Sequence, residues 1–295
     1  MKQIGFLACP GTLPGSPLRR ADAFEHDQQT GALRPALAQI DAELVEIDWH
    51  EADSAFAGLD LVLVGTPWDY QDEADAFLAR LDAIEASGVP LCNPASLVRW
   101  NLDKHYLAEL AQAGAPTIPT LWLDTPDAEN VDAAFDMFDC DRVVVKRRVG
   151  AGAEGQESFT RDAPPPAGWQ MDRPAMVQPF LPAIVEEGEY SFIFVDGAFS
   201  HALLKTAAKG DYRIQSLYGG QEVPVVPNDS DIATALGVIA AIPFTTPLYA
   251  RIDMVRGPQG ALLLMEAELV EPYLYPEQGP ELGPRMAEAI AARLR

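Results

Sequence analysis

Three carboxylates interrupt an apolar stretch near the end of the chain, LLLMEAELVEPYLY, which spans residues 262–275. The apolar residues are typical of a buried strand, whereas Glu266, Glu268 and Glu271 are not. Because side chains of a strand alternate between its two faces, Glu266 and Glu268 point the same way, and Met265 points the other way. The pattern therefore predicts a strand with one apolar face and one acidic face.

The preceding run, YARIDMV, alternates too and places Arg251 and Asp253 on one face. If a four-residue loop, Pro258–Ala261, closes a hairpin, Asp253 lies opposite Glu266 and Arg251 opposite Glu268, with Cβ atoms ~5 Å apart. Like charges this close repel unless a cation lies among them. One interpretation is a site for Mg²⁺ or Mn²⁺, which prefer hard oxygen ligands. The other is a solvated face with a salt bridge, and a one-residue slip would invert the faces.

A strand-borne lysine precedes a glycine-rich loop in VVVKRRVGAGAEG. Gly150, Gly152 and Gly155 match GxGxxG, but a dinucleotide site needs a helix to begin there, and three successive prolines follow instead. No GK[ST] follows, which excludes a Walker A motif. Lys146 and the backbone N–H groups of the loop are suited to phosphate oxygens; an ordinary surface loop is the alternative.

A second basic group occurs in LLKTAAKGDYRIQSLYGG and comprises Lys205, Lys209 and Arg213. Cations of this kind are suited to a carboxylate or an acyl phosphate, and arginine allows bidentate contact. Plain surface charges are the alternative.

The elements that position these residues form three predicted units. Alternating strands and helices predict a parallel α/β unit at 1–94, and α+β units with antiparallel sheet follow at 95–172 and 173–295. A helix in NLDKHYLAELAQAGA, capped by Asn101 or Asp103, opens the second unit. Asp196-Gly197 predicts a two-residue hairpin turn in the third.

Composition excludes several classes of protein. The formal net charge of −23 opposes binding to nucleic acid. No apolar run reaches the ~18 residues of a membrane span, and the N-terminal run is shorter than a signal peptide requires, so we expect a first strand there. Three scattered cysteines indicate a reducing compartment, and we expect the cytoplasm. A homodimer is the commonest assembly of soluble enzymes, although the sequence does not specify one.

Five segments occur in the order of a known superfamily: NPASLVRWNLDKHYLAEL, VVVKRRVGAGAEG, MVQPFLPAIVEEGEYSFIFVDG, LLKTAAKGDYRIQSLYGG and RIDMV…LLLMEAELVEP. Together they resemble the ATP-grasp carboxylate–amine ligases of the bacterial glutathione synthetase type, over roughly residues 93–275. The TPWDY segment is also similar to the branch that forms cycloserine from an O-ureidoserine. The resemblance implies an N-terminal parallel-sheet domain and two α+β subdomains that sandwich ATP.

The resemblance also implies roles for individual residues. Lys104 and Lys146 match the lysines that hold the ATP phosphates, and Glu187 or Glu189 matches the residue that binds the ribose hydroxyls. The remaining matches are Gln178, Phe180 and Leu181 at the adenine hinge, Asp253, Glu266 and Glu268 at the metal, and Lys205 and Arg213 around the acyl phosphate. Glu268 replaces the asparagine commoner in the superfamily.

The implied reaction is attack of a substrate carboxylate on the γ-phosphate of ATP, followed by displacement of phosphate from the acyl phosphate by an amine. The expected substrate is a small amino-acid-like molecule or a peptide, and the product is an amide or a ring. Trp68, Asp69 and Tyr70 are candidates for the acceptor pocket, with aromatic packing as the alternative. A catalytically silent ATP-binding regulator of the same fold is the rival function.

Overall fold

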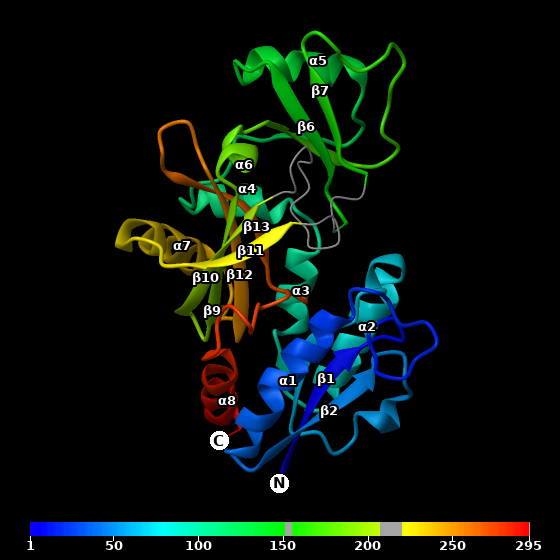
Figure 1. Ribbon diagram of the computed structural model, residues 1–295. Coiled ribbons are helices and arrows are strands. Elements are labelled where there is room, and N and C mark those ends of the chain that lie inside the picture. Colours follow the sequence, from blue (N-terminus) through cyan, green and yellow to red (C-terminus); the bar gives the residue numbers. More distant parts are fainter. Residues whose placement is uncertain (151–154, 207–219, 295) are drawn as a thin grey trace.

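Three sheets organise the chain in a computed structural model that describes residues 1–150, 155–206 and 220–294 (Figure 1). The N-terminal sheet has the order β2-β1-β3-β4, the central sheet β5-β8-β6-β7, and the third sheet β11-β10-β9-β12-β13. Each sheet buries its own apolar cluster, and a further cluster links the first sheet to the third. The mixed α/β and α+β class expected from the sequence is confirmed.

The N-terminal sheet is parallel, as the strand–helix alternation predicts. Its strands are short apolar runs, and the helices that connect them cover its faces. The elements are β1 (Lys2–Ala8), α1 (Phe24–Ala38), β2 (Ala42–Asp48), the 3₁₀ helix η1 (Asp53–Ala55), β3 (Leu61–Thr66), the 3₁₀ helix η2 (Tyr70–Asp72), α2 (Ala74–Ala86) and β4 (Leu91–Cys92). β1 confirms that the N-terminal run is a strand.

The helix predicted to begin at Asn101 or Asp103 is present but begins later, at Tyr106, and Asp103 Oδ1 accepts a hydrogen bond from His105 N (2.9 Å) just before it. Two short helices, α3 (Ala95–Asn101) and α4 (Tyr106–Gln112), flank a turn. Asn101 ends α3 instead of capping a helix; its side chain donates to Ala267 O (2.8 Å) and accepts from Leu269 N (2.9 Å). An amide side chain supplies one donor and one acceptor in the same spacing as a strand backbone, so Asn101 covers part of an exposed sheet edge.

The central sheet extends past the boundary expected at residue 172. It contains β5 (Leu121–Leu123), β6 (Arg142–Arg147), β7 (Glu157–Thr160) and β8 (Ala175–Pro179), with α5 (Ala128–Met137) packed on one face. β8 pairs with β5 and β6, so this sheet ends at Pro179. A strand, β7, also follows the glycine-rich loop where a dinucleotide site would need a helix, which confirms the exclusion of that fold.

The third sheet is antiparallel and carries most of the candidate residues. Asp196 and Gly197 have φ of 51° and 74°, as a tight hairpin turn requires, and they join β9 to β10 as predicted. Its elements are α6 (Ala183–Glu186), β9 (Glu189–Val195), β10 (Ala198–Thr206), β11 (Gln221–Val225), α7 (Asp229–Ala241), β12 (Tyr249–Arg256), β13 (Leu262–Glu268) and α8 (Leu282–Arg293).

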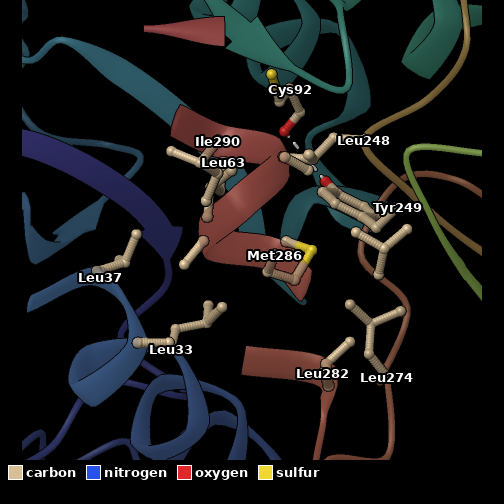
Figure 2. Close-up of a cluster of buried hydrophobic side chains, with 14 of the residues drawn as sticks. Leu33, Leu37, Leu63, Cys92, Leu248, Tyr249, Leu274, Leu282, Met286 and Ile290 are labelled. Carbon is tan, nitrogen blue, oxygen red and sulfur yellow. Dashed lines mark hydrogen bonds between the residues drawn. The ribbon is translucent and has the colours of Figure 1, made fainter. Parts of the chain in front are cut away.

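A buried apolar cluster fixes the N-terminal unit to the third sheet (Figure 2). The C-terminal helix α8 lies beside α1 at the base of the molecule, and Met286 and Ile290 pack with Leu33 and Leu37 of α1 (Figures 1 and 2). Gly283 allows this approach, because a Cβ there would lie 2.3 Å from Ala32 O. The N-terminal unit is thereby held against the strands that carry the site.

Two further sequence expectations concern the chain as a whole. Cys9, Cys92 and Cys140 are all free thiols. Among the helices described, none is long and apolar enough to cross a membrane.

Candidate active site

The β12–β13 hairpin has the pairing predicted at the site. Asp253 lies opposite Glu266, and Arg251 lies opposite Glu268. The route to this register differs from the prediction, because the loop is the five-residue Gly257–Ala261. Met265 is then left unpaired as a bulge, which restores the pairing. The bulge also changes the apolar face, where Leu264 rather than Met265 joins Ala267 in the buried cluster.

Asp253 is buried at 3% exposure within a network of cations. Arg251 Nε lies 3.1 Å from both of its carboxylate oxygens, and Lys205 Nζ lies 3.4 Å from Oδ1. Ser191 donates a further hydrogen bond to Oδ1. Burial opposes ionisation of Asp253, but the charges of Arg251 and Lys205 outweigh it and lower the pKa of the carboxyl. Asp253 is therefore an ionised, fully engaged carboxylate.

The same two cations hold one further carboxylate each. Arg251 pairs with Glu268, and Lys205 pairs with Glu189 on the adjacent strand. Burial raises the pKa of Glu268 to about 8, with the charge of Arg251 acting in the opposite direction. Burial also opposes the charge on Lys205, but Asp253 and Glu189 raise its pKa. Charges this deep are stable only as a complete set, because each removal leaves an unpaired partner.

A cleft of about 610 Å³, partly open to solvent, lies beside the acidic strand. Glu266 and Glu268 line it, and Lys104 Nζ lies 3.1 Å from Glu266 Oε1 and donates to Gly150 O. Asp253 is not among the lining residues. Within residues 1–150, 155–206 and 220–294, no three carboxylate, histidine or cysteine side chains are close enough to hold a metal ion. The three predicted ligands are thus neighbours in register, but their side chains turn to different partners.

The hard oxygen donors facing the cleft suit Mg²⁺ or Mn²⁺ for two of the three predicted ligands, Glu266 and Glu268. Asp253 would join them only if its contacts with Arg251 and Lys205 rearranged. The carboxylate oxygens of these residues are therefore ligands of the kind that Mg²⁺ and Mn²⁺ prefer.

The predicted nucleotide residues lie along the central sheet. Lys146 on β6 is half-buried, which lowers its pKa, and the part of the chain that the structure describes places no carboxylate within ion-pair distance of it. Gln178 on β8 is 2% exposed; its amide donates to Thr120 Oγ1 (3.0 Å), and its Oε1 accepts from no donor among the described residues. Phe180 and Leu181 follow β8, and the guanidinium of Arg142 lies 3.9 Å from the Phe180 ring centroid. A nucleotide would supply both missing partners, namely a phosphate for the Lys146 ammonium group and a hydrogen-bond donor for Gln178 Oε1.

The remaining predicted residues divide into three groups. Glu187 directly follows α6 and accepts from the Tyr190 hydroxyl (2.5 Å), whereas Glu189 is buried against Lys205. Lys205 is 5% exposed and lies within β10. Gly152, Lys209 and Arg213 lie outside the described residues.

Tyr70 is the member of the Trp68–Asp69–Tyr70 segment that lines the cleft. Trp68 packs under Arg20, with 5.3 Å between the guanidinium and the ring centroid, and Asp69 accepts from Trp49 Nε1 at 2.7 Å. Neither residue lines the cleft, and the acceptor role predicted for them stays a prediction.

Arg251 and Glu271 belong to the site but were not assigned functional roles from the sequence. Arg251 bonds Asp253, Glu268 and the carbonyl of Tyr273, so it anchors the strand ends. Glu271 lines the cleft three residues past Glu268. The alternation of YARIDMV was a usable signal for Arg251, whereas Glu271 lies beyond the strand, where alternation no longer applies.

Known proteins match the chain over most of its length. The family model for the N-terminal domain of D-cycloserine synthetase DcsG matches residues 4–93. The cycloserine biosynthesis protein DcsG of Streptomyces lavendulae is 29% identical over 264 residues, covering 84% of the chain and 88% of that protein. A glutathione synthetase of Prochlorococcus marinus (strain MIT 9313) is 27% identical, covering 72% of the chain and 67% of that protein.

Solved structures give the same result. The crystal structure of D-cycloserine synthetase DcsG has a TM-score of 0.83 at 25% identity and covers 99% of this chain and all of that one. The ATP-grasp ligase PsnB, complexed with a precursor variant, Mg and ADP, has a TM-score of 0.67 at 14% identity, covering 99% of this chain and 98% of that one. The D-alanine–D-alanine ligase of Bacillus anthracis has a TM-score of 0.65 at 15% identity, covering 100% and 98%. The last two similarities show the shared fold.

The three-sheet architecture and these similarities show that the chain has the ATP-grasp fold of these ligases. The chain is homologous to the D-cycloserine synthetase DcsG.

Proposed function

We propose that the chain uses ATP to form an amide-type bond, by ligation or by cyclisation, on a small amino-acid-like substrate. The observation that carries the proposal is the cleft in which Lys104 and Gly150 meet Glu266 and Glu268. Similarity to D-cycloserine synthetase over most of both chains supports cyclisation. Similarity to glutathione synthetase supports ligation of a peptide as the second candidate.

ATP is the proposed nucleotide. Lys104 and Lys146 would hold its phosphates, because an anion would offset the burial of Lys146. The adenine amino group would donate to Gln178 Oε1, beside Phe180 and Leu181. Glu187 or Glu189 would accept from the ribose hydroxyls, and the backbone of the loop containing Gly150 and Gly152 would cover the phosphates.

Glu266 and Glu268 would hold Mg²⁺, with Mn²⁺ as an alternative, and Asp253 is the proposed third ligand. When bound, the ion supplies positive charge that offsets the negative charge developing on the transferred phosphoryl group. The lysines orient that group for attack by the substrate carboxylate, which yields ADP and an acyl phosphate. An amine then attacks the acyl carbon and displaces phosphate, and Arg213 with Lys205 would stabilise the negative charge of the acyl phosphate and of the phosphate as it leaves.

The reducing cytoplasm is the proposed compartment, because the three cysteines are free thiols. We expect a small molecule as the partner, neither nucleic acid nor membrane, and a homodimer as the assembly to be tested by light scattering.

ADP release tests the proposal. Purified protein is incubated with ATP, Mg²⁺ and a panel comprising O-ureidoserine, D-alanine, and a glutamate-containing dipeptide with glycine. We expect at least one member to raise ADP release about tenfold or more above the substrate-free rate, and Lys146→Met to abolish that increase. Tight binding of ATP without ADP release for any member would overturn the proposal in favour of a catalytically silent ATP-binding regulator.

A further inference from the structure

The cleft beside β13 has two chemically different ends. Lys104 and Gly150 line the end assigned to the phosphates, where Lys104 pairs with Glu266 of β13. Tyr70 and Gln71 of the N-terminal unit line the cleft as well, together with Glu271, which follows β13. A ligand in the cleft therefore contacts both the ATP-grasp part of the chain and the N-terminal unit.

Glu271 differs from the other acidic residues of this region in having no cation. Asp253 and Glu268 pair with Arg251, Glu266 pairs with Lys104, and Glu189 pairs with Lys205. For Glu271, no lysine, arginine or histidine of the described ranges lies within ion-pair distance. Burial raises its pKa to about 7, although the Tyr70 hydroxyl acts in the opposite direction. The Tyr70 hydroxyl only partly offsets the cost of burying this carboxylate, and a cationic ligand would remove the remaining penalty.

We propose that Glu271 binds a primary ammonium group of the substrate, at the end of the cleft away from Lys104. The inference rests on the proposed function and narrows its substrate to an amino acid whose amino group is free. With the ammonium at Glu271, the carboxyl group of the same molecule extends toward Lys104 and the phosphates. Tyr70 and Gln71 contribute a hydroxyl and an amide at the same end of the cleft.

The ammonium bound at Glu271 is not the nitrogen that attacks the acyl phosphate. An attacking amine must be neutral, and a carboxylate partner favours the charged form. The reacting carbonyl also lies toward the phosphate end, whereas Glu271 lies with the residues of the N-terminal unit. Glu271 is thus a specificity-determining residue, and a different nitrogen or a second substrate performs the attack.

Binding measurements without turnover test this inference separately from the proposed function. Calorimetry with a non-hydrolysable ATP analogue and Mg²⁺ compares two matched pairs of probes: O-ureidoserine with 3-(ureidooxy)propanoate, and D-alanine with propanoate. Each pair differs in the amino group alone. We expect the wild-type protein to bind at least one amine-bearing probe about 10–100 times more tightly than its partner, as a charge-assisted hydrogen bond provides.

Glu271→Gln should remove most of that preference while leaving the affinity for the ATP analogue within about twofold. Glu277→Gln, an exposed change on the same segment, is the matched control and should alter neither. Thermal unfolding shows whether each variant is folded, and Tyr70→Phe provides a second, milder change at this end of the cleft. A Glu271→Gln protein that keeps the full preference, or a wild-type protein with no preference in either pair, would overturn the inference. Loss of ADP release across the panel with the preference intact would instead overturn only the proposed function.

Discussion

Two hairpins of the third sheet hold the buried charges of the site, and each contains one extra residue in its second strand. In β9–β10, the two-residue Asp196-Gly197 turn is followed by an irregularity at Ser200. Pairing continued from Phe199 opposite Phe194 would set Lys205 against Gly188, but the extra residue sets it against Glu189. The Lys205–Glu189 ion pair therefore depends on a bulge in a hairpin whose turn is ideal.

The β12–β13 hairpin reaches the same result from a less regular loop. Pairing continued from Arg256 opposite Leu262 would set Asp253 against Met265, an apolar side chain. The bulge at Met265 moves Glu266 into that position. In both hairpins, a bulge next to the site rather than the turn determines which charged side chains meet, as bulges near functional sites commonly do.

The largest expected effect concerns the first hairpin. Lys205→Met leaves Asp253 and Glu189 buried without their shared cation, so we expect the free energy of unfolding to fall by about 3–5 kcal/mol and ADP release to be lost. Urea unfolding and the ADP assay measure the two effects. The double variant Lys205→Met, Glu189→Met should recover part of the stability but none of the activity. Full stability of the single variant would show that the β9–β10 charges do not depend on one another.

The second prediction concerns the difference between Asp253, which is buried, and Glu266 and Glu268, which line the cleft. Glu266→Gln removes a carboxylate that lines the cleft, and we expect the Mg²⁺ concentration for half-maximal activity to rise about tenfold or more, with stability nearly unchanged. Glu268→Asn, which introduces the residue commoner in the superfamily, should retain metal-dependent activity. A Glu266→Gln enzyme with an unchanged Mg²⁺ dependence would place the metal elsewhere.

The third prediction uses the pKa of Glu268. Burial raises it to about 8, above the value of ~4.5 for an exposed glutamate, so its contribution to stability is complete below pH ~4.5 and is lost as pH rises through about 8. In metal-free protein, the slope should be smaller than the ~1.4 kcal/mol per pH unit of one full proton. Glu268→Gln should flatten it, as urea unfolding from pH 5 to pH 9 would reveal. An unchanged slope in the variant would assign the titration to another group.

Much of the fold was predictable because local signals agree with the tertiary structure. The N-terminal parallel sheet follows from apolar runs separated by helical patterns, and the Asp196-Gly197 turn follows from its φ requirement. The break between α3 and α4 was not predictable in this way. Asn101 ends α3 and bonds to Ala267 and Leu269, which lie more than 160 residues away in the chain. Such contacts override helix periodicity without leaving a local signal.

The candidate site shows the same division. Strand alternation with an assumed four-residue loop predicted Asp253 opposite Glu266, a register that the structure reaches through a longer loop and the bulge at Met265. Neither signal could show which cation each acid would contact. Arg251 and Asp253 are both buried, so each needs the other as a partner. Burial depends on the assembled sheet and cannot be predicted from strand alternation. Glu271 was recognisable as an acid out of place, yet its position in the cleft depends on the N-terminal unit packed against it.

The smallest expected effect tests the role of the bulge directly. Deleting Met265 removes the unpaired residue and leaves Leu264 opposite Met254 and Glu266 opposite Asp253, so the acidic face is kept. The deletion shortens the chain between Leu264 and Ala267, whose carbonyl accepts from Asn101, so we expect the free energy of unfolding to fall by about 1–2 kcal/mol. ADP release should stay within about tenfold of wild type. Deleting Ala267 is the matched control: it forces Glu268 onto the apolar face and should cost far more. If both deletions lowered stability and ADP release equally, the site would require the extra residue itself and not only the pairing that it permits.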